Sequence, residues 1–127
     1  MFIKIYSFLV LLFTLTLVSC YEQERNCADF KTGKFESEIE IDGKKVTTSF
    51  ERNDSIQIET YDNISDTYTI RWTNDCEYIV QNKNPKNRNE KKAVQFKILT
   101  TTTKGYTFEY SFVGESKKQR GTVTKVD

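Results

Sequence analysis

Through most of the chain, apolar residues recur at every second position. Residues 34–41 show the pattern plainly, because Phe35, Ile39 and Ile41 share one face while a lysine and three glutamates share the other. A period of two is typical of a strand with one buried face, whereas a helix repeats its apolar residues every three to four positions. The segment therefore predicts a β-strand, and Asp42-Gly43 after it is a strong signal for a two-residue hairpin turn.

The alternation continues through seven further segments, separated by turns such as Asn53-Asp54 and Asn74-Asp75. No substantial stretch after the N-terminal segment shows the helical period. We therefore predict an all-β fold, a small antiparallel meander of about eight strands that forms a closed barrel or a partly open one. The inward positions expected in the later strands are Val46, Thr48, Phe50, Ile56, Ile58, Tyr68, Ile70, Trp72, Cys76, Tyr78, Val80, Val94, Phe96, Ile98, Tyr106, Phe108, Tyr110 and Phe112, followed by a weak strand at 122–126.

Ten aromatic side chains fall on the predicted inward face, enough to fill the interior of an eight-stranded barrel. One interpretation is that they form a solid core. The other leaves part of the lumen open for a small apolar molecule, with Trp72, Tyr78 and Phe108 as its lining. The ten residues are Phe35, Phe50, Tyr68, Trp72, Tyr78, Phe96, Tyr106, Phe108, Tyr110 and Phe112.

The first 20 residues predict a bacterial lipoprotein signal peptide. Lys4 precedes an apolar run of 14 residues at 5–18, and Leu17-Val18-Ser19-Cys20 has the form of a lipobox. A helix that crosses the bilayer needs about 20 apolar residues, so the run is short for a membrane anchor. We expect cleavage before Cys20, acylation of Cys20 and attachment to the membrane through this lipid. The expected organisation is a signal peptide at 1–19, a lipidated tether at 20–32 and one barrel-like domain at 33–127, in a lipoprotein of the bacterial outer membrane, periplasmic or surface-exposed.

Charge and composition argue against several classes of function. The chain has 19 basic residues, so removal of Lys4 leaves 18 against 18 acidic residues and a formal charge of zero. A neutral chain is a poor candidate for nucleic-acid binding. It also has no histidine, the commonest general base and zinc ligand, and no carboxylate pair is forced by spacing. We therefore expect a monomer with no enzymatic activity, no catalytic residues, no metal site and no cofactor.

Cys27 and Cys76 are the two cysteines that remain beyond the lipidation site. In an oxidising compartment such a pair is expected to form a disulfide. The alternative has Cys76 buried as a small apolar residue and Cys27 free in the tether. A bridge would close a loop of about 50 residues, for which the chain-entropy model gives a stabilisation of about 4 kcal/mol.

A simple meander places alternate loops at opposite ends of a barrel. The end away from the N-terminus would collect the loops at 42–45, 62–66, 82–92 and 114–120, with ten basic residues against five acidic ones. Such a basic end would attract acidic glycans, surface polymers or acidic protein patches, unless its charges serve only to keep the loops soluble. Cys27 and Cys76 both fall at the other end, which agrees with the disulfide. The residues expected to contact an acidic partner are Lys83, Lys86, Arg88, Lys91, Lys92, Lys117, Lys118 and Arg120.

Three segments carry a resemblance to known proteins: 26–35 (NCADFKTGKF), 70–78 (IRWTNDCEY) and 96–100 (FKILT). Together they resemble a family of small uncharacterised Bacteroidota lipoproteins, some of which carry a transferred label of DNA topoisomerase IV subunit. The size and composition of this chain argue against that label. Gly33-Lys34-Phe35 also resembles the Gly-x-Trp of lipocalins, and Arg120 resembles the arginine near their last strand. This second resemblance implies a ligand-binding barrel.

Three short segments support further hypotheses. Glu22 and Glu24 resemble the acidic export signal of surface lipoproteins in Bacteroidota, and Asp54-Ser55-Ile56 resembles their O-glycosylation signal. The loop at 82–89 is long enough to insert into the active site of a secreted hydrolase. The leading hypothesis is a binding module that acts through the basic end, and the alternatives are a carrier of a small apolar ligand and a hydrolase inhibitor.

Overall fold

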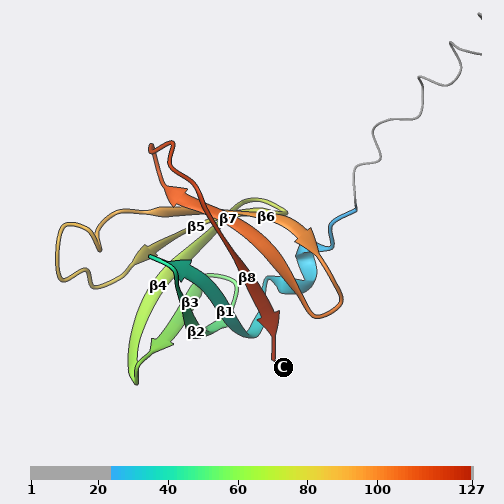
Figure 1. Cartoon of the computed structure of the whole chain (residues 1–127), viewed down its shortest axis with the longest axis horizontal. Helices are drawn as coiled ribbons and strands as arrows, with labels where there is room; N and C mark the ends of the chain where they lie inside the picture. Colours follow the sequence, from blue (N-terminus) through green and yellow to red (C-terminus); the bar gives the residue numbers. More distant parts are fainter. Residues whose placement is uncertain (1–23, 127) are drawn as a thin grey trace, which may run out of the picture.

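The computed structural model describes residues 24–126, and the structural statements below refer to these residues. Eight antiparallel strands pair in sequence order, and β8 returns to pair with β1, so the sheet closes into a barrel (Figure 1). The predicted all-β meander is thus confirmed, in its closed form. The elements are a short 3₁₀ helix η2 (Cys27–Phe30), followed by β1 (Gly33–Ile41), β2 (Lys44–Arg52), β3 (Ile56–Tyr61), β4 (Ile64–Asn74), β5 (Glu77–Asn82), β6 (Val94–Thr101), β7 (Gly105–Phe112) and β8 (Gln119–Lys125).

The β1–β2 hairpin shows how the alternation of the sequence becomes one wall of the barrel. Phe35 lies opposite Phe50 in the register, and their rings stack with centroids 5.0 Å apart. The connecting Asp42 and Gly43 have φ values of 51° and 78°, as a turn with two left-handed residues requires. Inward side chains of neighbouring strands therefore meet as cross-strand pairs.

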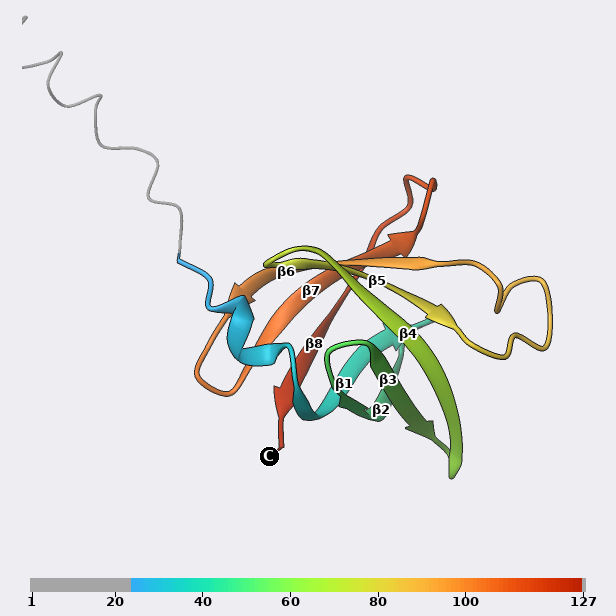
Figure 2. The ribbon, with the colours of Figure 1, turned by 180° about the vertical axis from the view of Figure 1, so that it is seen from behind.

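The barrel has two different ends, which are visible from both sides (Figures 1 and 2). We call the end with the β1–β2, β3–β4, β5–β6 and β7–β8 connections the open end, and the end with η2 the closed end. At the closed end, η2 buries Cys27 and Phe30, and the Phe30 ring packs edge-on against Tyr106 with centroids 5.3 Å apart. The folded domain therefore begins at η2, inside the segment 20–32 that was expected to be a tether. Phe30 explains this difference, because it fills the end of the barrel.

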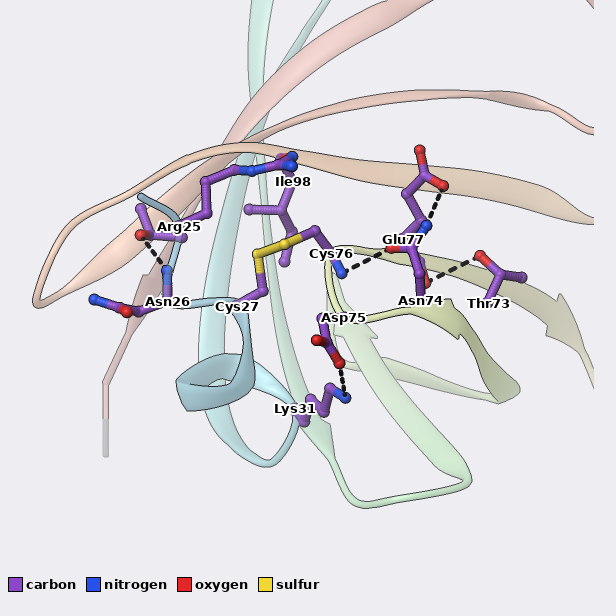
Figure 3. Close-up of a disulfide and its surroundings, with 11 residues drawn as sticks. Arg25, Asn26, Cys27, Lys31, Thr73, Asn74, Asp75, Cys76, Glu77 and Ile98 are labelled. Atoms are coloured by element: carbon purple, nitrogen blue, oxygen red, sulfur yellow. Dashed lines mark hydrogen bonds and ion pairs between the residues drawn. A yellow bond between two sulfur atoms is a disulfide. The ribbon is translucent and has the colours of Figure 1, made fainter. Parts of the chain in front are cut away.

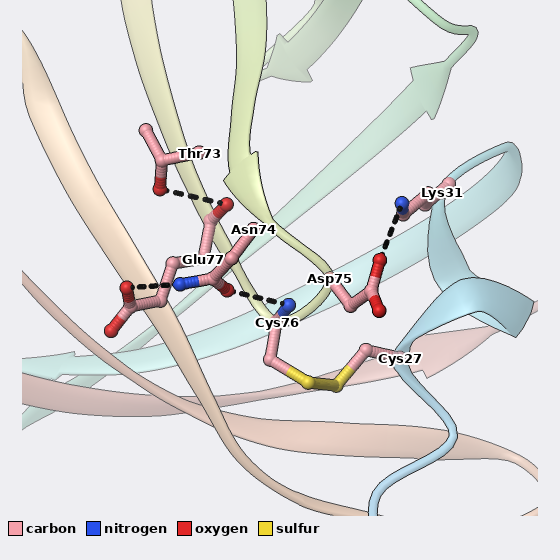
Figure 4. A network of polar contacts seen from close by, with 7 residues as sticks. All are labelled: Cys27, Lys31, Thr73, Asn74, Asp75, Cys76 and Glu77. Atoms are coloured by element: carbon pink, nitrogen blue, oxygen red, sulfur yellow. Dashed lines mark hydrogen bonds and ion pairs between the residues drawn. A yellow bond between two sulfur atoms is a disulfide. The ribbon is translucent and has the colours of Figure 1, made fainter.

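The predicted disulfide between Cys27 and Cys76 is confirmed and joins η2 to the β4–β5 turn (Figure 3). Polar contacts surround it (Figure 4). The Cys76 backbone N–H donates to the Asn74 side chain at 2.9 Å, and Lys31 pairs with Asp75 at 3.5 Å. These contacts fix the position of η2 against the turn.

Four apolar positions differ from the predicted inward pattern, and Ile56 and Ile58 are two of them. Ile58 is 43% exposed, because β3 has the opposite phase and turns Gln57 inward. Ile41 and Phe112 are 46% and 39% exposed. Both lie beyond the last residues of β1 and β7 that pair with β8, so they extend past the closed part of the barrel. Within residues 24–126, no helix is both long and apolar enough to cross a membrane.

Candidate functional site

Arg52, the last residue of β2, is buried inside the barrel with 3% of its surface exposed. Its Nε donates to Gln57 Oε1 at 2.9 Å, and Nη1 donates to the Phe30 carbonyl oxygen at 2.9 Å. Its Nη2 donates to the hydroxyls of Tyr78 and Tyr106 at 3.1 and 3.3 Å. The guanidinium therefore connects η2 to β3, β5 and β7 through one planar group.

Aromatic rings surround the same guanidinium. Arg52 Cζ lies 4.5 Å from the ring centroid of Tyr78, 4.9 Å from Phe50, 5.3 Å from Phe35 and 5.6 Å from Trp72. Among the described residues no carboxylate lies within ion-pair distance of Arg52. Its charge is therefore stabilised by aromatic faces and neutral oxygen acceptors, which are effective where water is excluded.

A hydrogen-bonded chain leads from Arg52 toward the open end. Gln57 accepts from Arg52 and donates through Nε2 to Glu59 Oε1 at 2.8 Å. Burial raises the pKa of the Glu59 carboxyl, while hydrogen bonds from Gln57 and Tyr68 and the charge of Arg52 act in the opposite direction. Asp66, the cross-strand neighbour of Glu59 on β4, raises this pKa further. Burial and the charges of Glu59 and Asp66 in turn raise the pKa of Tyr68.

The interior between Arg52 and the open end contains a cavity of about 240 Å³. Strands β1 to β4 contribute its polar groups, whereas β5 to β8 contribute an aliphatic and aromatic wall. The cavity persists because several aromatic rings stack on one another instead of filling the lumen, for example Phe96 on Tyr78 and on Tyr110, with centroids 5.0 and 5.7 Å apart. The lining from β1 to β4 consists of the polar residues Ser37, Thr48, Arg52, Gln57, Glu59 and Tyr68 with the apolar Ile39 and Phe50, and the facing wall of Tyr78, Val80, Val94, Phe96, Phe108, Tyr110 and Val123.

Two of the three residues predicted to line a ligand cavity do so. Tyr78 and Phe108 border the lumen. Trp72 lies outside this lining, with its ring 4.6 Å from that of Tyr78 and under the ammonium group of Lys31. The polar lining residues Arg52, Gln57 and Glu59 were not identified from the sequence. For Arg52 a signal existed, because it lies two residues after inward-facing Phe50 and so shares its face of β2.

The predicted basic residues all lie at or near the open end, and some are paired. Lys118 and Arg120 both approach Glu109, at 3.2 and 3.8 Å, and Lys92 pairs with Glu115 at 3.4 Å. Arg120, the residue that resembles the arginine near the last strand of lipocalins, thus faces outward. The cation of β8 that lies near Phe35 is Lys125, with its Nζ 5.9 Å from the ring centroid. Of the eight predicted basic residues, five are exposed and have no ion pair within the described part of the chain, namely Lys83, Lys86, Arg88, Lys91 and Lys117.

The fold and the lumen define a small closed antiparallel β-barrel with one polar and one apolar interior wall. Comparisons of the chain with models of protein families, with curated proteins and with solved structures find no match. Within residues 24–126, no group of three or more histidine, cysteine or acidic residues is placed to hold a metal ion.

Proposed function

We propose that this protein binds a small organic molecule in the lumen of its barrel and is held at the bacterial envelope by lipid on Cys20. The observation that carries the proposal is the cavity of about 240 Å³, bounded by polar groups on one side and aromatic rings on the other. Eight-stranded barrels are wide enough to hold one small ligand, and a few fixed polar groups in an apolar pocket are typical of ligand sites. The polar groups of the lining favour an amphipathic ligand over the purely apolar molecule that the aromatic pattern suggested.

A bulky side chain in the lumen tests this proposal. Val80 borders the cavity, and its neighbour Ile79 is on the outer face of β5. Val80→Phe should weaken the binding of 2-phenylethanol by about tenfold or more, which corresponds to ~1.4 kcal/mol, whereas Ile79→Phe should leave it unchanged. Binding is measured by isothermal titration calorimetry on the full chain in lipid nanodiscs, with empty nanodiscs as the blank. Equal binding by wild type and Val80→Phe would place the ligand outside the lumen and contradict the proposal.

The second candidate function is an interaction with acidic glycans or proteins through the β5–β6 loop. This loop projects from the open end (Figure 1) and carries Lys83, Lys86, Arg88 and Lys91 within nine residues. A surface of this kind favours salt-sensitive association with polyanions. The same loop is the segment that a hydrolase inhibitor would insert, but its basic charge favours a polyanion.

Charge reversal separates this second function from the first. Lys86→Glu with Arg88→Glu should abolish salt-sensitive retention of the full chain on a heparin column, because it changes the loop charge by four units. The matched control reverses Lys97 and Lys104, which are exposed elsewhere on the barrel. If both double variants lose retention equally, or if neither loses it, the loop is excluded as the binding surface.

A further inference from the structure

The lumen contains a carboxylate that can accept further hydrogen bonds. A carboxylate offers about four acceptor positions. Glu59 uses one of them for Gln57 Nε2, at 2.8 Å, and borders the cavity together with Tyr68. Its remaining acceptor capacity is available to a ligand that donates hydrogen bonds.

The charges near the cavity favour a cation over an anion. Arg52 and Glu59 line the cavity and contribute one positive and one negative charge, and Asp66, outside the lining but across from Glu59 on β4, contributes a second negative charge. A ligand with one positive charge would bring the sum of its own charge and these three charges to zero. An anion would lie beside Glu59 and would have to compete with Tyr78 and Tyr106 for the Arg52 guanidinium. Such an arrangement loses existing hydrogen bonds and adds repulsion.

The facing wall suits the remainder of such a ligand. Phe96, Phe108 and Tyr110 border the same cavity as Glu59. Aromatic faces attract ammonium groups, and they also provide apolar contact for a hydrocarbon body. The volume of about 240 Å³ equals that of about eight water molecules, so the molecule must be small.

We propose that the lumen selects small organic amines, with the ligand's ammonium group on Glu59 and its hydrocarbon part against Phe96, Phe108 and Tyr110. This inference rests on the proposed function and names the ligand class of the same site.

Three probes of similar size test the inference on the wild-type protein. They are 2-phenylethylamine, 2-phenylethanol and 3-phenylpropanoate, which differ mainly in the charge of one end. Their affinities for the full chain are measured by calorimetry at neutral pH in nanodiscs of zwitterionic lipid. The amine should bind at least about tenfold more tightly than the alcohol, and the carboxylate most weakly. If the alcohol or the carboxylate binds as tightly as the amine, the amine preference is wrong while lumen binding stands. If none of the three binds, both proposals fail.

Two matched variants locate the ammonium group. Glu59→Gln keeps the size and hydrogen-bonding shape of the side chain but removes its charge, so amine and alcohol should then bind about equally. Glu51→Gln makes the same exchange on the outer face of β2 and should preserve the preference. Near-UV circular dichroism checks that each variant is folded. The comparison of the three probes on wild type tests the amine preference even if a variant does not fold. An amine preference that survives in folded Glu59→Gln would overturn the assignment to Glu59.

Discussion

Arg52 is a buried cation whose direct partners are neutral oxygens and aromatic rings. Removal of a guanidinium from water is costly unless most of its N–H groups find acceptors. Here four hydrogen bonds use the planar, forked shape of the side chain, and the rings cover its faces. Arg52 therefore acts as a structural centre of the closed end, and it forms the floor of the lumen.

Arg52→Lys should be strongly destabilising. Lysine keeps the charge but cannot reach Gln57, Phe30 and both tyrosine hydroxyls from one planar group, so we expect a loss of about 2–4 kcal/mol in the free energy of unfolding. Arg71→Lys, the same exchange at an exposed position on β4, should change it by less than about 0.5 kcal/mol. Urea unfolding curves measure both. Similar values for the two variants would show that the hydrogen-bond network contributes little.

Glu59 should make amine binding depend on pH. Burial raises the pKa of this carboxyl in the folded protein, so protonation removes its charge at a higher pH than for a free glutamate. Amine affinity should therefore fall as the pH drops through this raised pKa, while the affinity for 2-phenylethanol stays constant. Calorimetry at several pH values measures amine affinity as a function of pH, and an amine affinity that stays flat down to about pH 4 would rule out Glu59 as the partner.

The same raised pKa also affects the stability of the fold. The contribution of Glu59 to the free energy of unfolding is largest below the pKa of the unfolded chain and is lost as the pH rises through the pKa of the folded protein.

At the scale of elements, the hairpins could be predicted from sequence and the phase of β3 could not. Asp42-Gly43 and the alternation in β1 and β2 are local signals, and both appear in the structure. In β3 the two isoleucines favour one phase, but the barrel adopts the other and turns Gln57 inward. Tertiary context overrides the apolar pattern, because Gln57 has a buried partner in Arg52 that no local signal reveals.

The disulfide should be a major contribution to stability. Cys27 and Cys76 are 49 positions apart, and the bridge holds η2 at the closed end. Replacement of both cysteines by alanine should lower the free energy of unfolding by about 4 kcal/mol, from the entropy that the unfolded chain regains. Urea unfolding of the variant, compared with wild type with and without reductant, measures the difference. A loss below about 1 kcal/mol would mean that η2 packing, and not the bridge, holds this end.

At the scale of the whole molecule, the start of the described chain and the lumen mouth lie at opposite ends of the barrel. The described chain enters at the closed end beside η2, and the loops of the open end lie on the far side (Figure 2). The predictions that concern residues 1–20, the signal peptide and the acylation of Cys20, fall outside the described residues. If the anchor is as proposed, the mouth faces away from the membrane and is accessible to ligands from solution.

Cys20→Ser tests the anchor independently of the lumen. Loss of the thiol removes the site of acylation, so the variant should move from the membrane fraction to the soluble fraction of the producing bacterium. Its affinity for 2-phenylethylamine should equal that of wild type, because the cavity is formed by β1 to β8. Fractionation with immunoblotting measures the first result. A variant that stays fully in the membrane fraction would contradict lipid anchoring at Cys20.

The aromatic pattern allowed two interpretations of the interior, and periodicity could not decide between them. Whether ten rings fill a barrel depends on how they stack. Phe96, for instance, lies against Tyr78, Phe108 and Tyr110 and leaves space on the β1–β4 side. The charged residues of the lumen were missed for a related reason, because Arg52 and Glu59 are normally interpreted as solvent-facing positions.

Native mass spectrometry of the full chain, released gently from the bacterium that produces it, tests the central claim most directly. The intact mass is compared with the mass after denaturation, and the Val80→Phe variant is treated in the same way. We predict that wild type carries a small non-covalent mass that is lost on unfolding, and that Val80→Phe carries none. A bare wild-type protein, or an equal added mass on both proteins, would contradict a ligand in the lumen.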